Sequence, residues 1–172
     1  MTNYDVDLTE SGSMPTDDDD SADVPSGNIL EQLTAELEKS IVRPEIEIVV
    51  PERPHISLRF SPNISQERLR SWRKNSGESS KRGIDSVKFA SYVIGDTCVG
   101  IYLNEKLVKG DNDIALTFTS KAIWEMTDAD TPFEAIDRMF GIDPHIESTA
   151  FTILEYAGYG DEVEAEDPIK LS

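Results

Sequence analysis

The residue types that carry most protein chemistry are sparse in this chain, and they are not spaced as a site. The chain has one cysteine and two histidines among 172 residues. His55 and His145 fall in different predicted elements, and neither has a second His or Cys at the spacing of a zinc motif. Cys98 has no histidine nearby in the sequence to activate it, and the sequence contains no phosphate-binding loop or GxSxG turn. We therefore predict that the protein is not an enzyme and binds neither a metal ion nor a cofactor.

The same three residues are expected to have structural positions instead. We expect His55 on the solvent face of a strand, His145 exposed in the first turn of a helix, and Cys98 as a small buried apolar residue. A lone cysteine excludes an internal disulfide and fits a reducing cytosol. The sequence has no run of about 18 apolar residues and no basic region followed by an apolar one at its N-terminus, so we predict neither a membrane span nor a signal peptide.

Carboxylates are abundant, and their densest runs lie near the two ends of the chain. Asp and Glu number 34 against 16 Lys and Arg, which gives a net charge of -18. Residues 1–27 contain acidic residues but no Lys or Arg, with the run Asp17–Asp20 at the centre, and the C-terminal stretch 161–172 begins with a second acidic run over residues 161–167. This composition predicts a disordered acidic arm at the N-terminus and a disordered acidic tail at the C-terminus.

These carboxylates are not arranged for chemistry. A calcium loop needs spaced oxygen ligands and a turn glycine, and four adjacent aspartates do not provide that spacing. Disordered carboxylates also cannot hold the fixed geometry of general acid and base catalysis. The excess negative charge repels nucleic acid phosphates and anionic membranes, so it favours a basic partner or solubility at high concentration.

One part of the chain is basic, the stretch from Arg59 to Lys88. Basic residues near an exposed aromatic such as Trp72 are typical of nucleic acid backbone contact combined with base stacking. Two other interpretations compete with this one. Trp72 can be the apolar anchor of an amphipathic helix, and the basic side chains can receive the acidic tails of this chain or of another subunit. We favour these two, so nucleic acid is not expected as a partner.

Residues 28–43 are predicted to form a short amphipathic helix and a linker. Asn28 is a typical helix cap, and the helix is expected to continue to about Ser40. Leucines recur in it at three- and four-residue spacing, so they fall on one narrow face. The helix is expected either to dock on its own domain or to lie in a groove of a partner. The candidate partner-binding residues are Leu30, Leu33, Leu37 and Ile41.

Residues 44–160 are predicted to form a single α+β domain, mainly helical, with a small β-sheet or hairpins. Pro51 and Pro54 interrupt the strand patterns, which suggests positions at a sheet edge. The expected elements are strands over 45–50 and 55–60, a helix capped by Ser65 with Leu69 and Trp72 inward, an apolar helix from Ile84 to about Val99, a strand or hairpin around Asn104 and Glu105, a strand over 114–118, and a helix capped by Ser120 that buries Ile123, Trp124 and Met126.

The strongest local signals lie in residues 131–160, which are predicted to form a helical hairpin. Thr131 is expected to cap the first helix, with Glu134 completing a capping box, and Gly141 to end it. Asp143 and the proline after it repeat the start signal, and Gly158 is the second stop. The side chains expected to pack between the helices are Phe133, Ile136, Met139 and Phe140 on the first and Ile146, Ala150, Ile153, Leu154 and Ala157 on the second.

The order of these pieces resembles a known family. The segments SLRFSPNISQERLRSWRK, VKFASYVIG, LTFTSKAIWEM and FEAIDRMFGIDPHIESTAFTILEYAGYG are similar to tail assembly chaperones of long-tailed (siphovirus) phages that infect actinobacteria. The resemblance covers residues 46–160, and the acidic arm and tail are similar too. Better-known tail chaperones are mainly helical, whereas the pattern here also predicts strands.

The resemblance implies a chaperone that binds the tape measure protein, keeps this long and aggregation-prone helical polypeptide soluble, and promotes tail tube polymerisation around it. The implied partners are the tape measure protein, the tail tube protein, a frameshift-extended form of this chain, and further copies of the chain itself. The implied location is the host cell cytoplasm, with the protein absent from the mature virion.

An acidic protein of this kind also has an interpretation from a different class. It can be a phage structural subunit of the connector or decoration type, or a nucleic-acid mimic that inhibits a host protein. A mimic needs carboxylates displayed on a rigid surface, whereas the densest runs here are predicted to be disordered. That contrast counts against mimicry.

Overall fold

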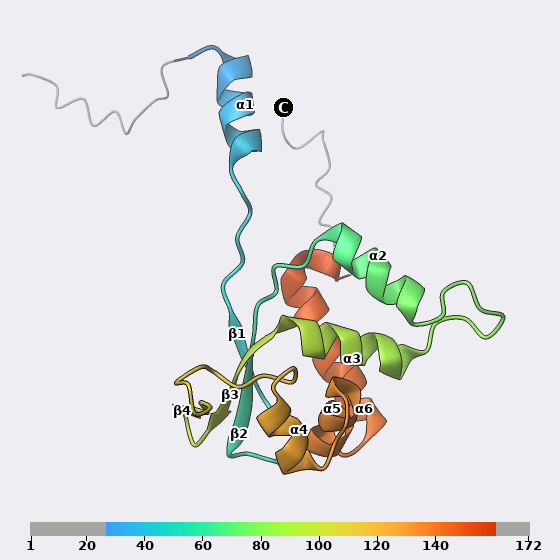
Figure 1. Cartoon of the computed structure of the whole chain (residues 1–172). Helices are drawn as coiled ribbons and strands as arrows, with labels where there is room; N and C mark the ends of the chain where they lie inside the picture. The colour runs from blue at the N-terminus through green and yellow to red at the C-terminus, as the bar shows by residue number, and fades with distance from the viewer. Residues whose placement is uncertain (1–26, 161–172) are drawn as a thin grey trace, which may run out of the picture. The chain divides into compact units, whose positions relative to one another are not determined.

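The structure, a computed structural model, describes residues 27–160 and divides after Ile41 into two units. The predicted acidic tail and residues 1–26 of the predicted acidic arm lie outside the described residues. Helix α1 (Ile29–Glu38) belongs to the first unit. The second unit, from Val42 onward, contains every other described element (Figure 1).

The second unit is a mainly helical α+β domain with a small antiparallel sheet, as predicted. Its elements are β1 (Ile46–Val49), β2 (Ile56–Phe60), α2 (Gln66–Asn75), α3 (Ser86–Thr97), β3 (Cys98–Leu103), β4 (Lys106–Leu107), α4 (Lys121–Thr127), α5 (Pro132–Phe140), α6 (Asp143–Leu154) and a π-helical turn η1 (Glu155–Tyr159).

The sheet has the strand order β1-β2-β3-β4, and each neighbouring pair is antiparallel. Ile48 of β1 pairs with Leu58 of β2, so the alternating apolar residues of both strands lie on the same face. Strand β1 lies at an edge, as expected. The edge prediction is wrong for β2, because β3 returns to pair with its other side. Pro51 and Pro54 lie in the connection between β1 and β2, where they interrupt no ladder.

Of the two alternatives expected around Asn104 and Glu105, a strand or a hairpin, the structure has the hairpin. These two residues link β3 to β4 and have φ angles of 48° and 66°. Left-handed conformations at both central residues are what a tight two-residue hairpin turn requires.

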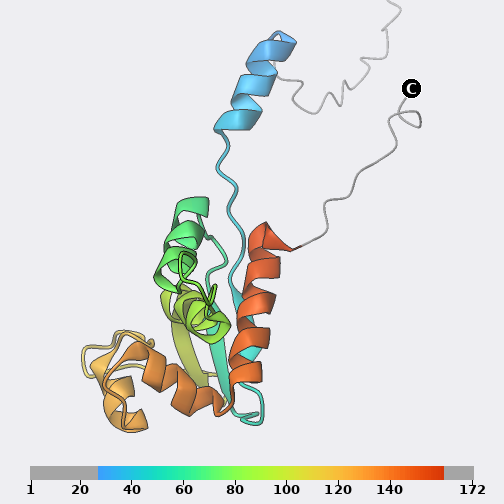
Figure 2. The ribbon, with the colours of Figure 1, turned by 90° about the vertical axis from the view of Figure 1, so that its right-hand side faces the viewer.

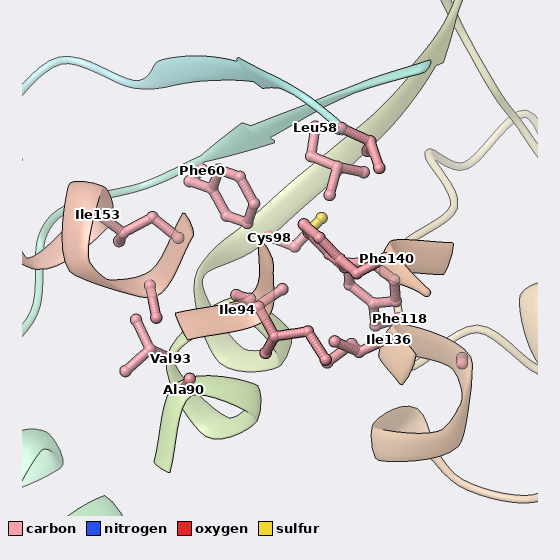
Figure 3. Close-up of a cluster of buried hydrophobic side chains, with 14 of the residues drawn as sticks. Leu58, Phe60, Ala90, Val93, Ile94, Cys98, Phe118, Ile136, Phe140 and Ile153 are labelled. Atoms are coloured by element: carbon pink, nitrogen blue, oxygen red, sulfur yellow. The ribbon is translucent and has the colours of Figure 1, made fainter. Parts of the chain in front are cut away.

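The helices of the second unit and the sheet share one core, because these helices cover the apolar face of the sheet (Figures 1 and 2). Figure 3 shows Leu58 and Phe60 of β2 directed toward Ile94 of α3, Ile136 of α5 and Ile153 of α6. Helix α6 packs more extensively on α3 than on α5, its partner in the hairpin. The core therefore depends on contacts between distant segments as well as on the local hairpin.

The local signals of the helical hairpin are mostly confirmed. The Thr131 hydroxyl accepts a hydrogen bond from the Glu134 backbone N–H at 3.2 Å, and Gly141 ends α5 with a φ of 83°. The Glu134 carboxylate accepts from the N–H of Asp130 at 2.7 Å rather than from that of Thr131. The reciprocal half of the predicted capping box is therefore displaced by one residue. Gly158 has a φ of 90° inside η1 and ends the helical path.

Two predictions in the middle of the chain are wrong. Residues 114–118 form no strand and make a single bridge, from Ala115 to Lys109, because a turn at 117–120 redirects the chain and buries Phe118. Met126 is exposed because it lies in the last turn of the short helix α4, in which only Ile123 is buried. The apolar helix expected from Ile84 to about Val99 is confirmed as α3, which ends at Thr97 where the chain enters β3 to pair with β2.

Candidate partner-binding surfaces

Helix α1 begins where the sequence predicts, at a reciprocal cap. The Asn28 side chain accepts a hydrogen bond from the Glu31 backbone N–H at 2.9 Å, and the Glu31 carboxylate accepts from the Asn28 backbone N–H at 3.2 Å. Each bond satisfies a donor that the first turn of a helix otherwise leaves free. The negative Glu31 also lies near the positive end of the helix dipole.

The four candidate partner-binding residues are each more than half exposed, but only three share the helix. Leu30, Leu33 and Leu37 lie on one face of α1. Ile41 lies beyond the helix, because α1 ends at Glu38 rather than near Ser40, and the C-cap has an extended backbone. The predicted continuation of the stripe through Ile41 is therefore wrong. We call Leu30, Leu33 and Leu37 the leucine stripe.

The leucine stripe has the chemistry of an unpaired half of a helix interface. Helix α1 has ten residues and contains no buried residue. A helix of this length is marginal alone and gains most of its stability from packing of its apolar face. The stripe can therefore receive an apolar helical partner, which would stabilise α1 in return.

A second candidate surface is a cleft between α3, α5 and α6, which no pattern in the sequence predicts. It encloses about 430 Å³. Its apolar part includes Phe133, which packs edge-on against Tyr92 with ring centroids 4.9 Å apart. Its lining residues are Asp85, Val87, Lys88, Ser91, Phe133, Glu134, Asp137 and Ile146.

Three carboxylates and one ammonium border this cleft. Asp85 caps α3 by accepting from the Lys88 backbone N–H at 3.1 Å, and Glu134 accepts from Asp130. Asp137 is exposed and makes no ion pair with any residue of 27–160. An apolar floor with a mainly acidic border fits an apolar side chain flanked by Lys or Arg.

The basic stretch from Arg59 to Lys88 lacks the exposed tryptophan that binding of nucleic acid by base stacking would require. Trp72 is only 2% exposed, and its indole N–H donates to the Asp96 carboxylate at 2.6 Å. Arg68 lies over the same ring, 5.8 Å from its centroid. Trp72 is therefore the apolar anchor of the amphipathic helix α2, which was one of the interpretations of the sequence. It is not available for base stacking.

The cysteine and histidine positions agree only in part with expectation. Cys98 is buried, as expected, and desolvation raises the pKa of its thiol from 9.0 to about 12. A thiol with this pKa is a poor nucleophile at neutral pH. His55 is exposed, as expected, whereas His145 is half-buried with its Nδ1 atom lacking a hydrogen-bond partner, so its predicted exposure is wrong.

The outer face of the sheet has a broad polar hollow of about 620 Å³ near His55, Glu47 and Glu105. Its residues are tied locally, since the Ser57 hydroxyl donates to the Glu47 carboxylate at 2.5 Å. Among residues 27–160, no group of three or more His, Cys, Asp or Glu is placed to hold a metal ion. No helix in that same range is long and apolar enough to cross a membrane.

Comparisons with known proteins do not assign a family. No protein-family model matches the chain, and no curated protein matches its sequence. Among solved structures, the crystal structure of the protein YqbN matches 71% of this chain and 91% of its own, with 17% sequence identity and a TM-score of 0.48. A likeness this distant says nothing about function.

Proposed function

We propose that this protein is a phage tail assembly chaperone that binds the tape measure protein, keeps it soluble and promotes polymerisation of the tail tube around it. The family resemblance over residues 46–160 suggests this role. The structural observation that supports it best is the leucine stripe of α1, which is exposed on a well-capped helix.

The physical basis of the proposed activity is coverage of apolar surface. A long helical client exposes apolar stripes that drive aggregation, and a second apolar helix can cover them. Binding then acts by mass action, since every client segment held by the chaperone is withdrawn from the aggregating pool. No nucleotide is required for this kind of holding.

The charge of the chain suits the same task. A net charge of -18 keeps the complex soluble through mutual repulsion. The cleft with its acidic border adds a second surface that would accept a basic and apolar client segment. Tail tube protein, a frameshift-extended form of this chain and further copies of the chain are proposed as additional partners.

The test of this function is co-expression with the longest open reading frame directly downstream in the genome. The expected result is that the downstream product is recovered in the soluble fraction and is pulled down with this chain. A downstream product that stays insoluble and is not pulled down with this chain would refute the proposed chaperone function.

The alternative of a connector or decoration subunit has a separate test. Purified phage particles would be analysed by mass spectrometry for peptides of this chain. A chaperone that acts in the host cytoplasm is expected to be absent from the particles. Stoichiometric amounts in the particles would favour the structural alternative.

A further inference from the structure

The described chain ends beside α2, and this position follows from specific contacts. The Tyr159 hydroxyl donates to the backbone carbonyl of Ile64 at 2.8 Å, just before α2 begins. Tyr159 also lines a small cleft of about 270 Å³ with Leu69 and Arg73 of α2. The last described residues therefore lie beside the start of α2 (Figure 1).

Basic side chains surround this point. Arg43 is held there by two hydrogen bonds with Asn63, and a Cβ atom placed on Gly158 would lie 2.7 Å from its Nη2 atom. Arg73 lines the small cleft, and Arg70 and Lys74 lie on the same flank of α2 by helical spacing. We call Arg43, Arg70, Arg73 and Lys74 the basic rim.

The basic rim is largely unneutralised within the described chain. Arg73 pairs with Glu78 at 3.4 Å, and both side chains are about half exposed. The other three basic side chains make no ion pair with any residue of 27–160. Glu67 in the first turn of α2 is the opposing charge on this helix. Residues 65–88 together carry seven Lys or Arg against three Asp or Glu.

The sequence directly after Gly160 has the complementary charge. Residues 161–167 read DEVEAED, with five carboxylates and no basic residue. Seven extended residues span up to roughly 24 Å, whereas a ten-residue helix such as α2 is about 15 Å long. These carboxylates can therefore reach every member of the basic rim.

We propose that the acidic residues Asp161 to Asp167 bind the basic rim of the same molecule. Direct attachment at Gly160 gives them an effective concentration on the order of millimolar, which no separate acidic chain matches at ordinary concentration. Exposed ion pairs are individually weak and screened by salt, so the contact forms and opens readily. Its effect is to occupy the most basic surface of an acidic protein and to exclude polyanions from it. This contact does not depend on the chaperone function.

The test is a comparison of backbone amide NMR spectra for the full chain and a variant with a neutral tail. The variant carries Asp161→Asn, Glu162→Gln, Glu164→Gln, Glu166→Gln and Asp167→Asn. We expect chemical shift changes at α2 and Arg43, and none at α4 or β4. Raising the salt concentration from about 50 to 500 mM should move the same amides of the native chain in the same direction, because screening weakens the contact.

Two charge-reversal variants make the test specific. Arg70→Glu with Lys74→Glu should abolish the response of α2 to tail neutralisation, whereas Lys106→Glu with Lys121→Glu changes the net charge equally and should preserve it. Arg70→Gln with Lys74→Gln is the milder substitute if the first variant does not fold.

Three outcomes would overturn the proposal. The first is an α2 spectrum that is identical with the native and the neutral tail. The second is a response that disappears on tenfold dilution, because the contact would then be between molecules. The third is an α2 spectrum that responds to deletion of residues 1–26 and not to the tail.

Discussion

The double substitution Leu33→Asp with Leu37→Asp places two charges in the leucine stripe of α1. Neither leucine belongs to the core of the second unit, and α1 contains no buried residue. We therefore expect the unfolding midpoint of the domain to be unchanged. Binding of an apolar helical client, in contrast, should be strongly weakened.

The size of this effect follows from the exposure of the two side chains. Leu33 is 53% exposed and Leu37 is 76% exposed. Because complete burial of a leucine contributes about 1.5–3 kcal/mol, covering the exposed parts of both contributes roughly 2–4 kcal/mol. The dissociation constant of the client complex should therefore rise by roughly 30- to 700-fold. Burial of the new carboxylates would add to this loss.

The assay is the soluble fraction of the client on co-expression, followed by a pull-down from that fraction. The control variant, Ala35→Asp with Lys39→Gln, makes the net charge more negative by the same amount outside the leucine stripe, at one helix position and at the C-cap of α1. It should retain client solubility close to that of the native chain. If the stripe variant and the control variant keep the client equally soluble, α1 does not hold the client and this reasoning fails.

Three further predictions test the fold. Trp72→Phe removes the indole hydrogen bond to Asp96 and should lower the free energy of unfolding in urea by about 1.5–3 kcal/mol, so a loss below about 0.5 kcal/mol would contradict the role of that bond. The raised pKa of Cys98, about 12, means that its contribution to stability is complete below about pH 9 and falls as pH rises toward 12. Between pH 8 and pH 10.5, the urea unfolding midpoint should consequently fall less for Cys98→Ala than for the native chain. Equal falls in the two proteins would contradict this role of the Cys98 thiol. Gly158→Ala should lower the free energy of unfolding by about 1–2 kcal/mol, because Gly158 has a φ of 90°. Gly95→Ala, in the regular helix α3, should raise it by about 0.5–1 kcal/mol. The melting temperatures of the two variants should therefore shift in opposite directions, and shifts in the same direction would refute these backbone roles.

The sequence predicted those features of the fold that neighbouring residues determine. Asn28, Ser65 and Thr131 each accept a backbone hydrogen bond at the helix start that the sequence indicated. The hairpin turn at Asn104 and Glu105 was one of the two alternatives that the sequence suggested there. Caps and tight turns are recognisable because their hydrogen bonds and φ angles involve residues only a few positions apart.

The features that depend on tertiary packing were not predictable in this way. The alternation in residues 114–118 is typical of a strand, yet Phe118 is drawn into the core and its carbonyl accepts from the Trp124 indole at 2.6 Å. The central position of β2 depends on its pairing with β3, about forty residues later. Tertiary contacts override local pattern at such positions.

The candidate surfaces also differ in whether neighbouring residues or distant segments form them. The leucine stripe was predictable, because one helix carries all its residues. The cleft brings Asp85 of the α3 cap together with Asp137 of α5 and Ile146 of α6, which no sequence spacing connects. The basic rim likewise joins Arg43 to α2 through contacts at Gly158 and Asn63.

Hydrogen exchange of this chain, alone and purified together with its proposed client, the tape measure protein, tests the central claim most directly. In the free chain, the amides of α1 are expected to exchange quickly, because the helix is short and has no buried residue. In the complex, we predict at least a tenfold slowing of exchange over Ile29–Glu38. Unchanged exchange in α1, with new protection confined to α3 and α5 around the cleft, would contradict the claim that the leucine stripe holds the client.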